Sequence, residues 1–176
     1  TIDGLKATGL IQKIYLLSTE VNESSVEGCT VISISGLNSS RTIKTIADKA
    51  DSPYTLLYTK YSALELGYFA LERMIPIMNV SNAGMVYADH YQIEGDNKKN
   101  APVIDYQFGS LRDDFNFGSV LLYKSEAFVD AAKRMKADYQ FAGLYDLRLK
   151  LSQKESLVHI NEYLYSEVEL DTRKSG

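Results

Sequence analysis

The sequence predicts an α/β protein with a mostly parallel central sheet and helices on both faces. Short apolar, β-rich segments alternate with segments of helical periodicity, as in parallel sheets whose strands are joined by crossover helices. Of the 176 residues, 45% are hydrophobic and 24% are charged, which is ordinary for a globular protein. We therefore expect one domain over residues 1–176.

The first fifty residues predict a helix end, two strands and a helix. Gly9 ends the helix expected over residues 1–8, because glycine adopts the left-handed conformation that such ends need. Apolar β-formers predict strands over residues 11–17 and 29–35. The loop 36–40 ends in good helix-capping residues, and apolar residues at helical spacing predict a helix over 41–50.

The middle of the chain continues this alternation. Pro53 precedes a strand expected over residues 54–58, and apolar spacing predicts a helix over 64–78. A strand is expected over 83–93, followed at 94–101 by a charged loop typical of a hairpin or a lid.

The second half of the chain predicts a mixed continuation of the sheet. Strands are expected over residues 103–108 and within 115–123, and helices over 126–136 and 144–151. Strand-like runs over residues 159–169 end the pattern.

Composition excludes several classes of function. The 19 basic and 23 acidic residues give a net charge of −4, so the basic footprint of a nucleic-acid-binding protein is absent. No apolar run approaches the roughly 18 residues that span a bilayer. Cys29 is the only cysteine, so the cysteine content does not point to an oxidising compartment. The sequence opens at Thr1, within a helix and without an initiator Met, so we expect an excised piece of a longer protein.

Ligands of open parallel sheets bind at the carboxyl ends of the strands. Four polar segments are expected at such ends: residues 18–20, 35–40, 59–62 and 87–90. The glycine-rich motifs of dinucleotide and P-loop sites are absent, and one Cys with two distant His cannot build a zinc site.

Carboxylates are the remaining candidates for chemistry. Asp113 and Asp114 lie in the densest polar and aromatic cluster, residues 112–118, and could act as a general base or bind a cation. A solvated turn is the alternative. Asp146 lies near the start of a predicted helix, where favourable interaction with the helix dipole would also explain it. Asp89 is expected at a strand end beside His90.

Read in order, the segments resemble a family 2 glycosyltransferase with the GT-A nucleotide-sugar fold. The resemblance covers nearly the whole chain, apart from a first strand of the family that would precede Thr1. It rests on the order and spacing of segments rather than on one motif. The segments are IQKIYLLSTE, CTVISISGLNSSRTIKTIADKADSPYTLLY, LELGYFALERMIPIM, AGMVYADHYQI, DDFNFGSVLLYKSEAF and GLYDLRLKLS followed by LVHINEYLYSEVE.

The resemblance implies a GT-A-like three-layer sandwich. It also implies transfer of a sugar from a nucleotide-diphosphate donor to a glycan or lipid-linked acceptor, as in polysaccharide biosynthesis. Because nucleotide-sugars are made in the cytoplasm, it further implies a cytoplasmic location, including the inner face of the membrane. The residues expected to do this fall into three groups: Ser18, Glu20, Asn38, Lys60 and Asp89 on the donor side; Arg112 and Asn116 on the acceptor side; and Asp146, Asp114 and Asp113, in that order, as the catalytic base.

The chain departs from the family at its metal site. The place of the DXD motif, which holds Mn²⁺ or Mg²⁺, is taken by Thr59, Lys60 and Tyr61, so no metal ligand is assigned and binding of Mn²⁺ or Mg²⁺ is left as an open alternative. Two interpretations follow. In the first, Lys60, with Arg41 or Arg112, supplies the positive charge that the departing diphosphate needs. In the second, catalysis has lapsed and the domain binds a nucleotide-sugar, a glycan or a partner protein.

Overall fold

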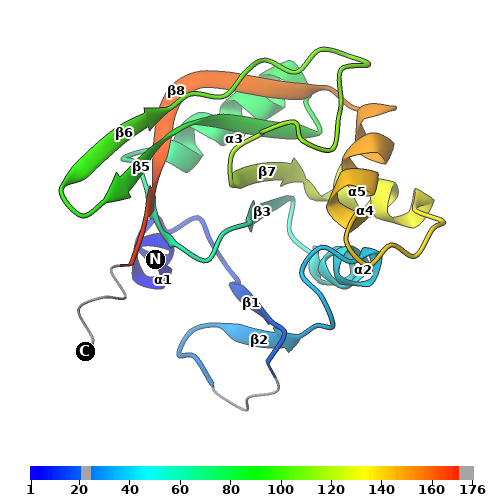
Figure 1. The fold of residues 1–176 in the computed structure, drawn as a ribbon, viewed down its shortest axis with the longest axis horizontal. Helices are drawn as coiled ribbons and strands as arrows, with labels where there is room; N and C mark the ends of the chain where they lie inside the picture. The colour runs from blue at the N-terminus through cyan, green and yellow to red at the C-terminus, as the bar shows by residue number, and fades with distance from the viewer. Residues whose placement is uncertain (21–24, 171–176) are drawn as a thin grey trace. The chain divides into compact units, whose positions relative to one another are not determined.

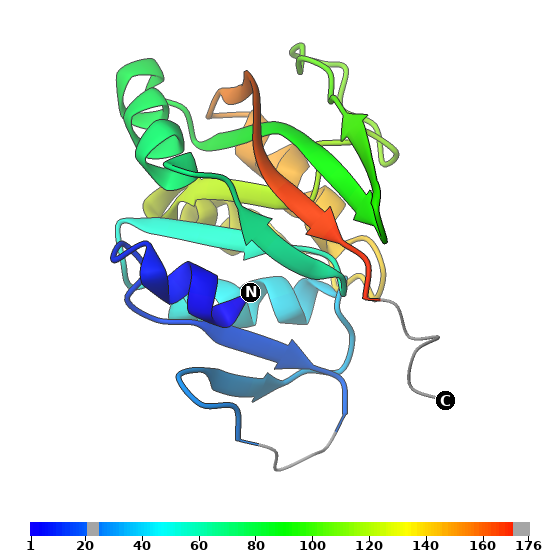
Figure 2. The same cartoon turned by 90° about the vertical axis from the view of Figure 1, so that its left-hand side faces the viewer.

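The structure, a computed structural model, describes residues 1–20 and 25–170, which form two compact units (Figures 1 and 2). Unit 1 contains Thr1 and the described residues of Leu56–Tyr123 and Ser156–Gly176. Unit 2 contains the described residues of Ile2–Thr55 and Lys124–Glu155. The single domain expected over residues 1–176 stays a prediction.

Unit 1 is built on a six-stranded sheet in which β3, β7, β5, β8 and β4 lie in that order and β6 pairs with β5. The strands are β3 (Tyr54–Tyr58), β4 (Ala63–Leu66), β5 (Met85–Glu94), β6 (Asn97–Ala101), β7 (Val120–Lys124) and β8 (Leu157–Val168).

The sheet is mixed and mostly antiparallel. Strand β5 runs antiparallel to β6 and β7, and β4 runs antiparallel to β8, whereas β5 and β8 are parallel. The expected GT-A-like sandwich with a mostly parallel sheet is therefore wrong. Alternating strands and helices fix the order of elements along the chain but not their partners. Here a tight turn at Gly95, with φ of 59°, sends the chain straight back from β5 into β6.

The two edges of this sheet curl toward each other. The edge strands β3 and β4 are joined by only four residues, 59–62, which span at most roughly 17 Å. In a flat row of five strands, the edges would lie about 19 Å apart. The connection is also folded rather than extended, because the hydroxyls of Tyr58 and Ser62 are 2.8 Å apart. The sheet is consequently barrel-shaped and nearly closed.

The core of unit 1 lies on β5, β7 and the helix α3 (Ala70–Ser81). Residues 85–88 and 120–123 are almost completely buried, as are Met74 and Met78 of α3. The expected helix over 64–78 is corrected here, since its first residues form β4. A side chain at Gly67 would place its Cβ 2.7 Å from the carbonyl oxygen of Leu164, so the backbone of strand β8 sits tightly against this point.

Unit 2 combines a small parallel sheet with four helices. Strands β1 (Tyr15–Ser18) and β2 (Thr30–Ser33) pair in parallel register. Helix α1 is Ile2–Ala7, and Gly9 follows it with φ of 69° as predicted. The helices α2 (Ser40–Lys49), α4 (Ser125–Arg134) and α5 (Gly143–Ser152) pack on one another. At Gly143 a Cβ would lie 2.5 Å from the carbonyl carbon of Ser39, so the start of α5 packs tightly against the backbone before α2.

Most predicted elements of both units are confirmed within a few residues. The strand over 54–58 and the three helices of unit 2 near 41–50, 126–136 and 144–151 are present. The hairpin expected as one alternative for the charged segment 94–101 is present, but most of the segment is strand β6 rather than loop. The strand expected over 103–108 is wrong, since these residues form a loop held by side chains.

Candidate functional site

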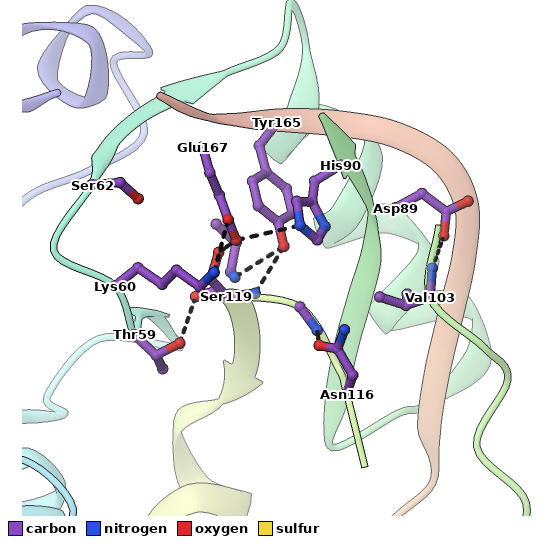
Figure 3. A network of polar contacts seen from close by, with 12 residues as sticks. Thr59, Lys60, Ser62, Asp89, His90, Val103, Asn116, Ser119, Tyr165 and Glu167 are labelled. Atoms are coloured by element: carbon purple, nitrogen blue, oxygen red, sulfur yellow. Dashed lines mark hydrogen bonds and ion pairs between the residues drawn. The ribbon is translucent and has the colours of Figure 1, made fainter. Parts of the chain in front are cut away.

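A buried polar cluster lies at the curled end of the sheet in unit 1 (Figure 3). We call Lys60, His90, Ser119, Tyr165 and Glu167 the Glu167 network. The Glu167 carboxylate accepts a hydrogen bond from the Ser119 hydroxyl at 2.5 Å and one from the Lys60 ammonium at 3.1 Å. The His90 Nε2 lies 3.3 Å from the carboxylate oxygen that Ser119 uses. One carboxylate thus joins β5, β8, the residue before β7 and the segment 59–62.

Local backbone geometry holds this network in place. Gly118 has φ of 77°, and a Cβ there would lie 2.4 Å from the Tyr165 hydroxyl. That hydroxyl therefore reaches the backbone and accepts hydrogen bonds from the Ser119 and Val120 amides at 2.9 and 3.3 Å. The His90 ring stacks on the Tyr165 ring, with 4.8 Å between their centroids.

Burial controls the protonation of the network. It lowers the pKa of His90 below its usual 6.5, an effect that the nearby Glu167 carboxylate opposes. Burial also raises the pKa of Tyr165 and Tyr58, so both phenols stay neutral. Among the described residues, the buried His90 Nδ1 has no hydrogen-bond partner.

A second cluster in unit 1 is centred on His159. Its Nε2 lies 2.7 Å from an Asp89 carboxylate oxygen, and its Nδ1 lies 2.5 Å from Asp105. The same Asp89 oxygen accepts a hydrogen bond from the Val103 amide at 2.9 Å.

The Tyr87 hydroxyl holds the same loop from the sheet. It donates a hydrogen bond to the Ile104 carbonyl and accepts one from the Tyr106 amide, and burial raises the pKa of Tyr87 to about 12. These contacts fasten the loop after β6 onto the sheet, so the Asp89 carboxylate serves a structural purpose here.

Unit 2 contains an open pocket of about 360 Å³ at the carboxyl end of β2 and the start of α2. Its lining residues are mostly polar: Ser33, Ile34, Ser35, Arg41, Thr42 and Thr45. Ser39 caps α2 by accepting a hydrogen bond from the Thr42 amide at 3.1 Å. The Thr42 hydroxyl in turn donates to the Gly36 carbonyl at 2.5 Å, which folds the loop back on the helix start.

Arg41 is the one charged residue among the described residues that line this pocket. The first turn of α2 contains Arg41 and no acidic residue. A cation in the first turn opposes the helix dipole, at a cost of about 0.3–1 kcal/mol. None of the ion pairs between described residues includes Arg41. An anion in the pocket would relieve this unfavourable arrangement.

The predicted site residues are distributed over both units. In unit 2, the Ser18 hydroxyl accepts from the Glu20 amide at 3.1 Å, and the Asn38 carbonyl accepts from Gly143 at 2.7 Å. Asp146 is buried on α5 with Lys150 3.3 Å from one oxygen, whereas the other has no partner among the described residues.

In unit 1, Lys60 joins the Glu167 network and Asp89 joins the His159 cluster. Arg112 and Asp114 form an exposed ion pair, with 77% and 68% of their side-chain surface accessible, and Asp113 is exposed. The Asn116 side chain accepts a hydrogen bond from the Gly118 amide at 2.8 Å and shapes the turn before β7. The catalytic and binding roles expected for all these residues stay predictions.

Sequence reasoning missed the residues that organise these sites. Ser119, Tyr165 and Glu167 were not singled out, although Tyr165 and Glu167 lie two apart on a strand and so share a face. The pocket residues of unit 2 had a clearer signal, since the polar segment 35–40 at a strand end was identified.

Two further features concern metals and membranes. In residues 1–20 and 25–170, no three His, Cys, Asp or Glu side chains are grouped so that they could hold a metal ion. That no metal ligand lies at residues 59–61, with Mn²⁺ or Mg²⁺ binding as the open alternative, stays a prediction. Across the same residues, every helix is too short or too polar to cross a bilayer. The cytoplasmic location stays a prediction.

No family model matches the chain, and no curated protein matches its sequence. Among solved structures, the chain is similar to the bifunctional IspDF from Campylobacter jejuni, with a TM-score of 0.51 and 10% sequence identity. The match covers 92% of this chain and 40% of that chain, so the chain spans less than half the length of IspDF. At this identity, the likeness shows the fold alone. It is a distant structural match to an enzyme and confirms no specific activity.

These findings overturn the expected resemblance to family 2 glycosyltransferases. No family model supports it, the structural likeness is to IspDF, and the main sheet is mostly antiparallel. The expected sugar transfer from a nucleotide-diphosphate donor to a glycan or lipid-linked acceptor is therefore wrong. The interpretation of the chain as a lapsed GT-A domain is wrong with it, as are the associated terms of polysaccharide biosynthesis.

Proposed function

We propose that the chain binds a small phosphorylated molecule in the pocket lined by residues 33–45 of unit 2. The observation that carries the proposal is the position of Arg41 in the first turn of a helix that opens onto a pocket, without an ion pair to any described residue. Helix N-termini attract phosphate groups because their backbone N–H groups and dipole are both positive toward the ligand. A guanidinium adds paired donors that match phosphate oxygens.

The shape and lining of the pocket support a ligand of modest size. About 360 Å³ lies within the range of small-molecule sites. The hydroxyls of Ser33 and Ser35 line it near the carboxyl end of β2 and can donate to phosphate or to a sugar ring. Beside them Ile34 provides an apolar surface. The pocket also lies where ligands of parallel strand pairs usually bind.

A thermal-shift panel tests the proposal on the whole chain. The probes are inorganic phosphate, pyrophosphate, a hexose phosphate and nucleoside mono- and diphosphates, each with Mg²⁺, with Mn²⁺ or with EDTA. A ligand at 100 times its dissociation constant adds about 2.7 kcal/mol of stability. For a chain of this length, that raises the melting temperature by roughly 5–10 °C.

Arg41→Ala and Lys44→Ala form a matched pair of variants. Both remove one exposed cation from α2, but Lys44 is not among the residues that line the pocket. We expect Arg41→Ala to weaken the binding of the responding probe at least about tenfold, since hydrogen bonds to charged groups contribute about 1.5–3 kcal/mol. Lys44→Ala should bind nearly as the parent does. Equal weakening by both variants would mean that the ligand senses only the net charge of the helix, which would contradict a built site.

A further inference from the structure

We propose that His90, Glu167 and Lys60 form a proton-operated clasp, which holds the segment 59–62 on the sheet at neutral pH and releases it on acidification. The clasp lies in unit 1 and is independent of the pocket proposed above. Its parts are drawn in Figure 3.

The geometry places two basic side chains on one carboxylate. Lys60 contacts one oxygen of Glu167 at 3.1 Å, and His90 Nε2 lies 3.3 Å from the other. While His90 is neutral, the buried carboxylate has one full cationic partner, Lys60. When His90 takes up a proton, the imidazolium becomes a second cation at the same carboxylate, and the three groups change from net neutral to a charge of +1.

The difference in burial between His90 and Lys60 decides which of the two leaves the Glu167 carboxylate. The side chains of His90 and Glu167 are only 4% and 6% exposed, whereas the Lys60 side chain is 50% exposed. A charged group in a dry interior is strongly unfavourable unless it is paired, but an ammonium that turns into water regains its hydration. The imidazolium therefore keeps Glu167, and Lys60 is the partner that is displaced.

Protonation also disturbs the position of the ring itself. The Nδ1 of His90 has no hydrogen-bond partner among the described residues, and it lies 3.5 Å from the position that a Cβ would take at Gly118. In the imidazolium, both nitrogens carry a proton. A buried N–H without an acceptor is unfavourable, so the ring moves toward Glu167 or toward water. Either movement loosens the packing beside Lys60.

The other groups that face His90 do not compete for this role. From β8, Tyr165 stacks on the ring, and from β3, Tyr58 lies near Glu167, but burial raises the pKa of both phenols above their usual 10. Ser119, the residue before β7, is neutral. Asp89, next to His90 on β5, is engaged by His159 and the Val103 amide. Ala101 of β6, which pairs with His90, carries no charge.

Hydrogen–deuterium exchange read by mass spectrometry tests the clasp at pH 7.5 and 5.5. Rates are corrected for the intrinsic dependence of amide exchange on pH. We expect peptides that cover residues 59–62 to exchange at least about fivefold faster at pH 5.5, while peptides from α3 stay unchanged. His90→Gln, which cannot gain the proton, should remove the increase. Lys60→Met should give fast exchange at both pH values, and Lys99→Met, on the exposed strand β6, should behave as the parent does.

Two outcomes would overturn the clasp. The first is an unchanged corrected exchange rate of 59–62 in the parent chain between the two pH values. The second is a full acid response in His90→Gln or in Lys60→Met. If His90→Gln does not fold, the comparison of Lys60→Met with Lys99→Met tests the clasp, because Lys60→Met changes a side chain that is only half-buried.

Discussion

Gly118 shows how one residue shapes the Glu167 network. Its φ of 77° favours glycine, and a Cβ would lie 2.4 Å from the Tyr165 hydroxyl. Gly95 also has positive φ, 59°, but no atom of the described residues lies within 4 Å of its Cβ position. We expect Gly95→Ala to lower the free energy of unfolding by about 1–2 kcal/mol, the cost of the left-handed backbone. Gly118→Ala should cost distinctly more, and urea denaturation measures both. Equal losses would show that Tyr165 can move aside freely.

Phe69 is a second position at which the backbone adopts the left-handed conformation, here with a bulky side chain. It has φ of 59° at the start of α3, yet 64% of its surface is exposed, so burial offsets little of the strain. We expect Phe69→Gly to raise the free energy of unfolding by about 1 kcal/mol, since glycine adopts this conformation readily. A loss of stability in urea denaturation would mean that the exposed ring stabilises the fold by contacts that outweigh the strain.

At the residue level, the sequence pointed to single members of clusters but not to their partners. Lys60 was identified because it stands where the glycosyltransferase family has its DXD motif, yet its partner Glu167 lies 107 positions away. Asp89 was identified at a strand end, but its partner His159 lies 70 positions away. Pairing at such distances depends on the register of β5 and β8, which local patterns do not encode.

At the scale of elements, helix α2 is the best-defined link between sequence and site. Its cap, Ser39, was expected from the loop 36–40, and its hydroxyl accepts from the Thr42 amide at 3.1 Å. Ser39→Ala should lower the free energy of unfolding by about 1 kcal/mol and weaken probe binding, because the same cap shapes the pocket. Ser39→Asp keeps a capping oxygen and should retain stability while its charge disfavours a bound anion. If Ser39→Asp bound phosphate as well as the parent, the pocket would not be an anion site.

Elements were predicted well where local signals were strong and poorly where tertiary contacts dominate. The strand at 54–58 and the helices of unit 2 follow from apolar spacing and caps. The helix expected over 64–78 was too long because its first residues pair with β8, and Gly67 donates its amide to Leu164 at 2.7 Å. Strand β6 was missed because its sequence, NKKNA, is polar and only the hairpin with β5 makes it a strand.

At the scale of the molecule, His90 links the stability of the native state to pH. Its pKa in the native state lies below 6.5, so the unfolded chain binds the proton first as pH falls through that value. The free energy of unfolding should therefore be highest above pH 6.5 and decline on acidification, by at most about 1.4 kcal/mol per pH unit for this one group. Urea denaturation between pH 5 and 8 measures the slope, and His90→Gln should reduce it. An unchanged slope in that variant would assign the pH dependence to other groups.

The pairing of the main sheet could not be predicted at this scale. Alternating strands and helices suggested parallel crossovers, and the resemblance to glycosyltransferases depended on the order of segments. Both signals describe only the order of segments along the chain, and sheets with different strand pairings can share the same order. The pocket of unit 2 was predictable in part, because it depends on β2 and α2, which are close in sequence.

The most direct test of our central claim, that the pocket at residues 33–45 binds phosphorylated molecules, is a pyrophosphate titration followed by ¹⁵N–¹H NMR. We predict saturable shifts of the amides of residues 33–45, centred on Arg41 and Thr42, which disappear in Arg41→Ala and persist in Lys44→Ala. An absence of shifts at millimolar pyrophosphate, or shifts confined to residues 59–62 around Lys60, would contradict the claim.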